Sequence, residues 1–231
     1  MTNRTASLLT VGIGIAAVAL TAVAGCRNPT PPPAPGTDKA AQIERGHHLV
    51  TIGGCHDCHT PLKFDPEVGM PVPDMSRALS GHPQGAPDPA ATPAGHDLAV
   101  IGPTMTSFRL GFGTVYTANL TPDEATGLGA WTEDMFVRAL RTGRHMGGAG
   151  RPILPPMPWP NLAQQTDADL KAVFAYLRSI PAIRNDVPAP KVPDAAMDAV
   201  AASYDKMMKK MRAAAAPQAT TGWRSDSRSR A

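Results

Sequence analysis

Apolar residues recur at helical spacing in several segments of this chain. The first segment starts near Thr37 or Asp38 and runs toward Ile52, where Gly53 and Gly54 end the pattern. Four of its residues are expected close to one face: Ala40, Ile43, His47 and Val50. The sequence therefore predicts a helix that ends immediately before a pair of closely spaced cysteines.

A second helix is predicted from Thr132 to Thr142. Thr132 is suited to cap its N-terminus, acidic residues follow in the first turn, and Gly143 favours its end. Its expected core-facing residues are Phe136, Val137 and Leu140.

A third helix is predicted from Asp167 to Ser179, with capping-box spacing between Thr166 and Asp169 and with Pro181 enforcing the exit. We interpret its apolar stripe as core packing: Leu170, Val173, Phe174 and Leu177.

A fourth helix is predicted from Asp194 to Ala215. It carries a stripe of larger side chains: Met197, Val200, Tyr204, Met208 and Met211. This helix either docks on its own domain or forms a contact for a partner or a membrane surface.

The remaining segments lack sustained periodicity. Between Pro61 and Gly113, proline, glycine and aspartate interrupt every pattern, and a loop of this length is expected inside a compact domain only if it covers something. Short strand pairing is possible around Thr114 to Asn119. Residues 182–192 are rich in proline and mark the expected end of the domain, and the chain from about Pro217 onward is expected to be disordered.

The N-terminus resembles a bacterial lipoprotein signal. Arg4 precedes an uncharged apolar stretch from Leu8 to Ala24, and the sequence Val-Ala-Gly-Cys ends at Cys26, which would receive the lipid. The alternatives are an uncleaved membrane anchor and ordinary cleavage near Cys26. Accordingly, we expect a signal peptide over 1–25 and a Pro-rich tether over 26–37.

The distribution of charge adds little to these structural predictions. The formal net charge is +3, but residues 38–181 carry 11 basic and 14 acidic side chains, whereas residues 182–231 carry 9 and 5. Nothing in this distribution argues for a nucleic-acid partner, and the basic end is most simply a solvated tail.

The sequence Cys55-His56-Asp57-Cys58-His59 carries the chemistry. The pattern C-x-x-C-H is typical of covalent attachment of a c-type haem, with both thiols bonded to the porphyrin and His59 as axial ligand of the iron. A dithiol redox pair or half of a zinc site are the alternatives, but Cys26 is the one other cysteine in the chain. One motif predicts one haem.

The sequence offers several candidates for the second axial ligand of the iron. Met157 is the favoured candidate because the prolines in Pro155-Pro156-Met157-Pro158 stiffen its loop. Its alternative role is that of a gap-filling core residue. Four other residues remain candidates: Met146, His145, His82 and Met105. Haem propionates could pair with the guanidinium groups of Arg109, Arg144 and Arg151.

In its order of helix, C-x-x-C-H, variable loops, Pro-flanked methionine and terminal helix, the chain resembles a class I cytochrome c over about residues 38–181. The sequences Asn-Leu-Thr-Pro-Asp at 119–123 and Thr-Gly-Leu-Gly-Ala-Trp-Thr at 126–132 make it similar to cytochrome domains of bacterial periplasmic dehydrogenases. The resemblance implies a mainly α, cytochrome c-like fold with long irregular loops and a contact between Gly46 and Tyr176. The helix predicted within 182–231 is then a C-terminal extension beyond that domain.

It also implies haem attachment at Cys55 and Cys58 and axial ligation by His59 and Met157. Those dehydrogenase subunits usually carry several haems, whereas this chain has one motif, and the segment from Pro61 to Gly113 is longer than a minimal cytochrome requires.

The expected function is electron transfer rather than enzymatic catalysis, on the periplasmic side of a bacterial membrane and through a lipid anchor. The expected partners are redox proteins, with no small-molecule substrate required. One alternative is an electron-accepting subunit of a larger dehydrogenase complex. Another is a haem peroxidase or sensor with an open distal site, served by His82, His96 or His145.

Overall fold

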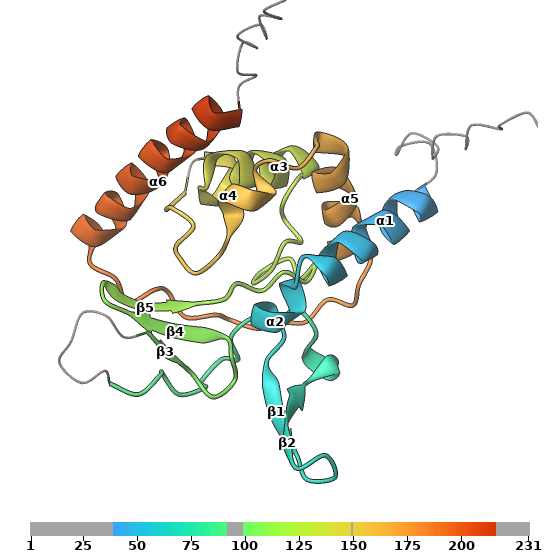
Figure 1. The fold of residues 1–231 in the computed structure, drawn as a ribbon. Coiled ribbons are helices and arrows are strands. Elements are labelled where there is room, and N and C mark those ends of the chain that lie inside the picture. The colour runs from blue at the N-terminus through green and yellow to red at the C-terminus, as the bar shows by residue number, and fades with distance from the viewer. Residues whose placement is uncertain (1–38, 92–98, 149, 216–231) are drawn as a thin grey trace, which may run out of the picture. The chain divides into compact units, whose positions relative to one another are not determined.

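The computed structural model describes residues 39–91, 99–148 and 150–215 (Figure 1). Within these residues the α-helices are α1 (Lys39–Ile52), α2 (Cys55–His59), α3 (Glu133–Thr142), α4 (Trp159–Leu162), α5 (Asp167–Leu177) and α6 (Asp194–Ala215). Two 3-10 turns accompany them: η1 (Met75–Arg77) and η2 (His145–Gly148). Helices therefore account for most of the regular structure in the described part of the chain, which also contains two small sheets.

Helices α1 and α5 pack closely against each other because a glycine lies at their contact. A Cβ atom on Gly46 would collide with the carbonyl oxygen of Ala172 and would lie 2.8 Å from Cβ of Tyr176. The Tyr176 ring also packs against His47, with 5.0 Å between the ring centroids. The expected contact between Gly46 and Tyr176 is confirmed.

Local signals in the sequence define the ends of α3. Thr132 caps its N-terminus by accepting the backbone N–H of Met135 at 3.2 Å, and Gly143 ends the helix in the left-handed region with a φ of 66°. Both predictions are confirmed.

The N-terminus of α5 was also predicted correctly, whereas its C-terminus was placed two residues too far along. Thr166 caps the helix by accepting the backbone N–H of Asp169 at 3.1 Å, but α5 ends at Leu177 rather than at Ser179. The end of the predicted pattern forms a turn instead, in which the Ser179 N–H donates to Tyr176 O.

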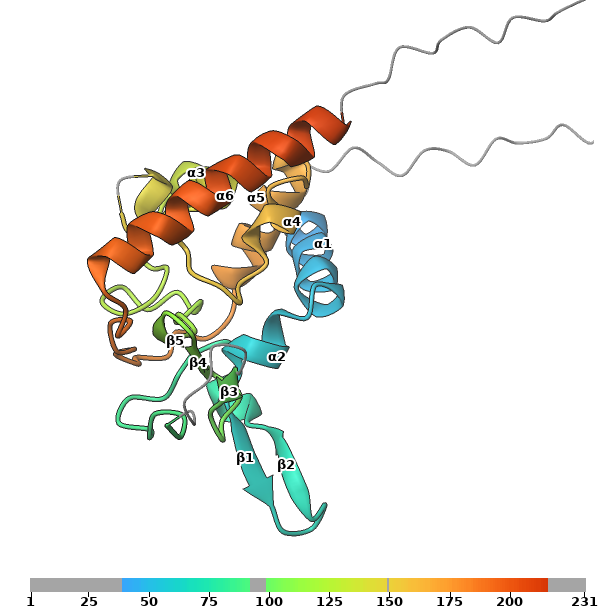
Figure 2. The same cartoon turned by 60° about the vertical axis from the view of Figure 1, so that its left-hand side comes forward.

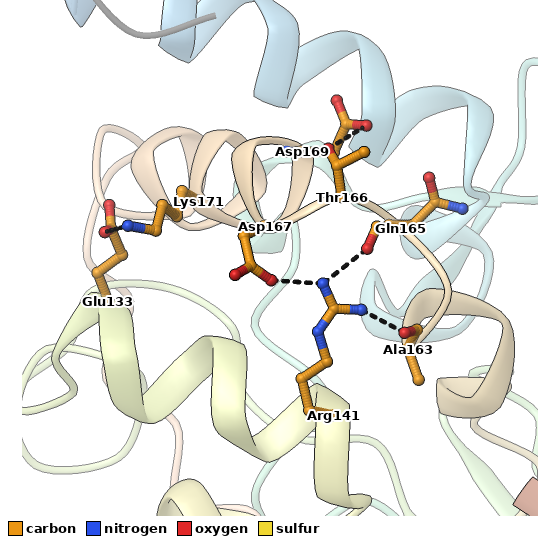
Figure 3. Close-up of polar contacts among 8 residues, drawn as sticks. All are labelled: Glu133, Arg141, Ala163, Gln165, Thr166, Asp167, Asp169 and Lys171. Carbon is orange, nitrogen blue, oxygen red and sulfur yellow. Dashed lines mark hydrogen bonds and ion pairs between the residues drawn. The ribbon is translucent and has the colours of Figure 1, made fainter.

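Arg141 fastens the last turn of α3 to the segment between α4 and α5 (Figure 3). Its guanidinium donates to the carbonyl oxygens of Ala163 and Gln165 and pairs with Asp167 at 2.5 Å. A second ion pair, between Lys171 and Glu133 at 3.0 Å, joins α5 to the start of α3.

The prediction of no regular structure between Pro61 and Gly113 is wrong. This segment contains β1 (Leu62–Asp65) paired with β2 (Met70–Pro73), and β3 (Val100–Ile101) and β4 (Ser107–Leu110), which pair in the order β3-β4-β5 with β5 (Gly113–Tyr116). All pairs are antiparallel. The strands are only two to four residues long, so no alternation was sustained enough to predict them.

Helix α6 docks on the domain, which confirms the first of its two interpretations (Figure 2). Met208 is buried among the residues of the main core, and the Tyr204 ring meets Trp159 edge-on with 5.1 Å between centroids. The proline-rich segment before α6 is also held in place, since Lys191 forms an isolated β-bridge with Thr114. The expected domain limits stay a prediction.

The core consists of two apolar clusters. The first contains residues of α1, α3, α5 and α6 together with Trp159. The second contains Phe108, Val115, Leu154 and Val192. The expected signal peptide, tether and lipid-bearing Cys26, as well as His96 and the tail from Pro217, lie outside the described residues.

Candidate haem site

The two cysteines lie on α2, a single helical turn that follows the left-handed Gly54. Residues three apart on a helix project from the same side, so Cys55 and Cys58 face a common region. Both thiols are free and partly buried. Cys55 packs against the first apolar cluster and Cys58 against the second, which places the motif where the two clusters meet.

The environment of the thiols disfavours a dithiol redox pair. Burial, and then the negative charge of Asp57, raises the pKa of Cys55 to about 11 and also raises the pKa of Cys58. Reactive cysteines have lowered pKa values, because the thiolate is the nucleophile and the metal ligand. In the described residues there is also no cluster of three or more His, Cys, Asp or Glu suited to a metal ion.

His59 is held in one orientation and one tautomer. The side chain is buried, and its Nδ1 lies 2.8 Å from the carbonyl oxygen of Ala118. A carbonyl oxygen can only accept, so Nδ1 carries the proton and donates it, which leaves Nε2 with a free lone pair. Burial lowers the pKa of His59 and thereby favours this neutral form. These are the properties of a histidine that ligates a metal through Nε2.

The backbone around His59 is fixed by the segment that follows β2. The His59 carbonyl oxygen accepts the N–H of Gly81 at 2.8 Å, and the buried Thr60 hydroxyl accepts the N–H of Leu79 at 2.9 Å. The Leu79 carbonyl in turn accepts the N–H of Leu120 at 2.9 Å. The loop that carries Ala118 and the turn that carries His59 are therefore connected through residues 79–81.

Asn185 holds that connecting segment with all four of its side-chain hydrogen bonds. Its amide donates to the carbonyl oxygens of Ser80 at 2.7 Å and His82 at 2.8 Å, while its oxygen accepts from Arg77 and from the Gln84 N–H, each at 2.9 Å. The side chain is almost fully buried. Sequence reasoning missed this residue, because it lies in a proline-rich segment that was interpreted as the domain's end.

Asn119 makes a similar set of contacts next to Ala118. Its amide donates to the carbonyl oxygen of Ile183 at 2.8 Å and to the Thr126 hydroxyl at 3.1 Å. Its oxygen accepts from both the N–H and the hydroxyl of Thr121. The carbonyl that orients His59 is therefore flanked by a residue that is itself locked in place.

Met157 lies in the loop between η2 and α4, which extends from the helices toward β5 and α2 (Figures 1 and 2). Its side chain is partly buried and packs against the first apolar cluster, whereas Leu154 in the same loop belongs to the second. The loop is anchored beyond Met157 by the buried Trp159, which packs over Gly143. Met157 is thus placed among apolar side chains, in the loop that contacts both clusters.

The other methionine candidates have less favourable surroundings. Met146 is 55 % exposed, and both it and Met105 have a positive φ, of 53° and 60° respectively. Neither is among the residues packed against the two clusters.

The histidine candidates make other contacts. His82 is fully buried, with Nδ1 2.9 Å from the Thr106 hydroxyl, and it stacks on Tyr116. His145 lies edge-on to Trp131, and desolvation, together with the nearby Arg151 charge, lowers its pKa to about 4.

Two of the arginines proposed for propionate pairing have different environments. The Arg109 guanidinium donates to the Pro89 carbonyl oxygen at 3.0 Å and is thus already engaged. The Arg151 guanidinium likewise donates to a carbonyl oxygen, that of Pro152, at 3.2 Å. Burial lowers its pKa, and it has no carboxylate partner in the part of the chain that the structure describes. A partly buried guanidinium without a carboxylate partner is suited to an anionic group.

An apolar groove of about 350 Å³ lies next to the Met157 loop. Pro155, Phe112 and the side of α6 around Val200 and Tyr204 line it.

The chain resembles cytochrome c subunits of bacterial dehydrogenases. It is 30 % identical over 136 residues to the gluconate 2-dehydrogenase cytochrome c subunit of Pantoea cypripedii, and 29 % identical over 136 residues to the cytochrome c subunit of the quinone alcohol dehydrogenase of Gluconobacter oxydans. Each alignment covers 59 % of this chain, and they cover 22 % and 21 % of the two relatives.

A further relative is a nicotinate dehydrogenase subunit from Pseudomonas putida, 31 % identical over 161 residues, which are 70 % of this chain and 10 % of that protein. The chain therefore matches only a tenth to about a fifth of the length of these relatives. No family model matches it. In the described residues, no helix has the length and hydropathy needed to cross a membrane.

Proposed function

We propose that this chain is an electron-transfer protein with one haem c, bonded through Cys55 and Cys58 and ligated by His59 and Met157. The observation that carries the proposal is the orientation of His59. Its Nδ1 is committed to the Ala118 carbonyl, its Nε2 lone pair is free, and two partly buried thiols lie within the preceding four residues. The likeness to cytochrome c subunits supports the same conclusion.

The surrounding residues fit such a group. Cys55 and Cys58 would hold the porphyrin through thioether bonds, and burial raises the pKa of both thiols, which favours the protonated form in the protein alone. The two apolar clusters would supply apolar side chains against the macrocycle and would limit the access of water to it. Arg151 is available for a propionate. The proposed fold is accordingly that of a cytochrome c.

The bound group supplies one-electron exchange between ferric and ferrous iron. The protein's part is to hold both axial ligands in place through the cycle. The hydrogen bond from His59 to Ala118 keeps the ring from rotating, and the packed loop around Met157 holds a weak thioether donor in an apolar environment. A methionine ligand raises the reduction potential relative to a second histidine. No substrate pocket is needed for this role.

The physiological role that we favour is electron acceptance from a dehydrogenase on the periplasmic side of a bacterial membrane. The names of the relatives describe subunits of gluconate and alcohol dehydrogenases, which supports a dehydrogenase partner for this chain. A lipid on Cys26 and a Pro-rich tether would keep the protein at the membrane. The proposed role is that of an electron carrier without an active site of its own.

The ligation by Met157 is tested by spectroscopy of the oxidised and reduced protein. The ferric form should show the weak sulfur-to-iron charge-transfer band of methionine-ligated haem, and Met157→Ala should abolish it. The reduced parent should not bind carbon monoxide, whereas the reduced variant should bind it readily. Rapid carbon monoxide binding by the parent would contradict the proposal and favour a peroxidase or sensor with an open distal site. Met146→Ala is the matched control and should leave both properties unchanged.

A further inference from the structure

The hairpin formed by β1 and β2 projects from the body of the protein in both views (Figures 1 and 2). Only Thr60 and Pro61 separate it from His59. Five of the seven large exposed hydrophobic side chains of the described residues lie between positions 52 and 75, on both sides of the cysteine motif. These five are Ile52, Phe64, Val68, Met70 and Met75, with exposed fractions of 56 to 66 %.

The register of the hairpin places apolar residues together on one face. Phe64 pairs with Pro71 and Leu62 pairs with Pro73, and directly opposite residues share a face of a β-ladder. This face therefore contains only apolar side chains. A two-stranded hairpin is marginally stable by itself in water, so an unpartnered apolar face on it is a cost unless another surface covers it.

The outer edge of β2 is poorly suited to pairing with another strand. Proline is accommodated in an edge strand with its nitrogen facing solvent, so Pro71 and Pro73 remove two donors from the outer edge of β2. A partner therefore meets the face of the hairpin through side chains.

The border of the hairpin is acidic, although the whole chain has a net charge of +3. Residues 55–75 contain four carboxylates and one lysine, a net charge of −3. Lys63 is paired with Asp74 at 3.2 Å, which leaves the carboxylates of Asp57, Asp65 and Glu67 without a basic partner in the described residues. Charge complementarity therefore favours a basic surface as the partner.

We propose that this hairpin patch (the apolar face formed by Leu62, Phe64, Pro71 and Pro73, with Val68 and the carboxylate of Glu67 in the turn at its tip) is the docking surface for a redox partner protein. The partner presents an apolar area bordered by lysine or arginine. The assignment rests on the proposed function, because it explains why the patch adjoins the cysteine motif. Electron-transfer encounters bury little surface, generally less than about 1,200 Å² in total, so they do not require an extended interface.

A small probe with the partner's chemistry tests the patch directly. Tris(1,10-phenanthroline)chromium(III) is a paramagnetic, redox-inert cation with aromatic ligands, and it broadens the NMR signals of amides near which it binds. We expect the strongest broadening over residues 62–75 of the isotope-labelled full chain, and weaker broadening at high ionic strength. Phe64→Ser should weaken the binding by about threefold or more. The anion hexacyanochromate(III) should not broaden these signals.

The matched control is Ile101→Ser, which removes an exposed apolar side chain from β3 and should change nothing. Broadening centred elsewhere on the protein, or equal broadening in the parent and in Phe64→Ser, would overturn the assignment.

Kinetics connect the patch with electron transfer. Oxidation of the ferrous protein by tris(1,10-phenanthroline)cobalt(III) should slow in Phe64→Ser and in Glu67→Gln, while oxidation by ferricyanide should not slow. A parallel loss with both oxidants would mean that the haem environment had changed and would count against docking. A colourless protein would remove the proposed function, whereas the relaxation measurement would still report on the patch, so the two failures are distinguishable.

Discussion

Two halves of this molecule are held together by different forces, and the candidate site lies where they meet. Helices α1, α3 and α5 associate through close apolar contact, with a glycine at the tightest point. The segments that hold His59 are instead fixed by buried hydrogen bonds, in which asparagine and threonine side chains satisfy backbone groups. The difference shows that the helical half (α1, α3 and α5) contributes to stability mainly by packing. The polar half (the segments around residues 79–82, 118–121 and 183–185) instead fixes the orientation of the His59 ring.

The largest effect is expected at the helix contact. Gly46→Ala should destabilise the protein by about 3 kcal/mol, because the added Cβ collides with the Ala172 carbonyl. Helix propensity alone predicts the opposite sign, a gain of about 1 kcal/mol. The free energy of unfolding in urea, compared between the parent protein and Gly46→Ala, decides between these two predictions. Gly69→Ala is the control for the collision, since nothing lies within 4 Å of its added Cβ. Its φ of +76° costs about 1–2 kcal/mol, which the loss in Gly46→Ala should exceed.

The stability of the protein is expected to depend on pH through His145, which follows α3. Its pKa is lowered from 6.5 to about 4, so the folded state binds this proton less readily than the unfolded chain. The contribution of neutral, partly buried His145 to the free energy of unfolding is therefore fully present above pH 6.5. It is lost as the pH falls toward 4, by up to about 3 kcal/mol. His145→Asn should flatten that part of the stability profile, measured by urea unfolding between neutral and acidic pH. An unchanged acid loss in the variant would contradict this role.

Substitution of Asn185 tests the hydrogen bonds that fix the segments around His59. Asn185→Ala leaves the carbonyls of Ser80 and His82 without their donor and should cost about 2 kcal/mol of unfolding free energy. Because the same segment contacts the backbone of His59, hydrogen exchange of the His59 ring N–H should also accelerate in the haem-loaded variant. If Asn185→Ala lost stability but the exchange of the His59 ring N–H stayed unchanged, Asn185 would not influence the orientation of His59.

The smallest effect on the free energy of unfolding is expected at the N-terminus of α3. Thr132→Ala removes the cap of α3 and should cost about 1 kcal/mol, measured by thermal or urea unfolding. Thr142→Ala, at the other end of the same helix, removes only a bond from the hydroxyl to the Arg138 carbonyl and should change stability by less than about 0.5 kcal/mol. Equal losses at both ends would mean that capping is not the cause.

The helical half could be predicted from the sequence, because its signals are local. Caps at Thr132 and Thr166, the stop at Gly143 and the apolar periods all lie within the helices that they define. The helix after residue 193 was found in the same way, and docking on its own domain was one of the two roles expected for its stripe.

The polar half could not be predicted, because its interactions join positions far apart in the chain. The bond from Asn185 to Ser80 spans 105 residues, and neither residue type has a periodic signature. The strands between Pro61 and Gly113 are too short to establish alternation. The cysteine motif and Met157 could be selected from the sequence as candidates, but the carbonyl of Ala118 that orients His59 could not, since every residue has one.

The central claim is that this polypeptide bonds a haem through Cys55 and Cys58. The most direct test is intact-mass spectrometry of the purified protein after expression together with a c-type maturation system. We predict a mass increase of one haem that survives denaturation and disappears in the Cys55→Ser, Cys58→Ser double variant. A colourless parent protein with both thiols free to react with an alkylating reagent would contradict the claim.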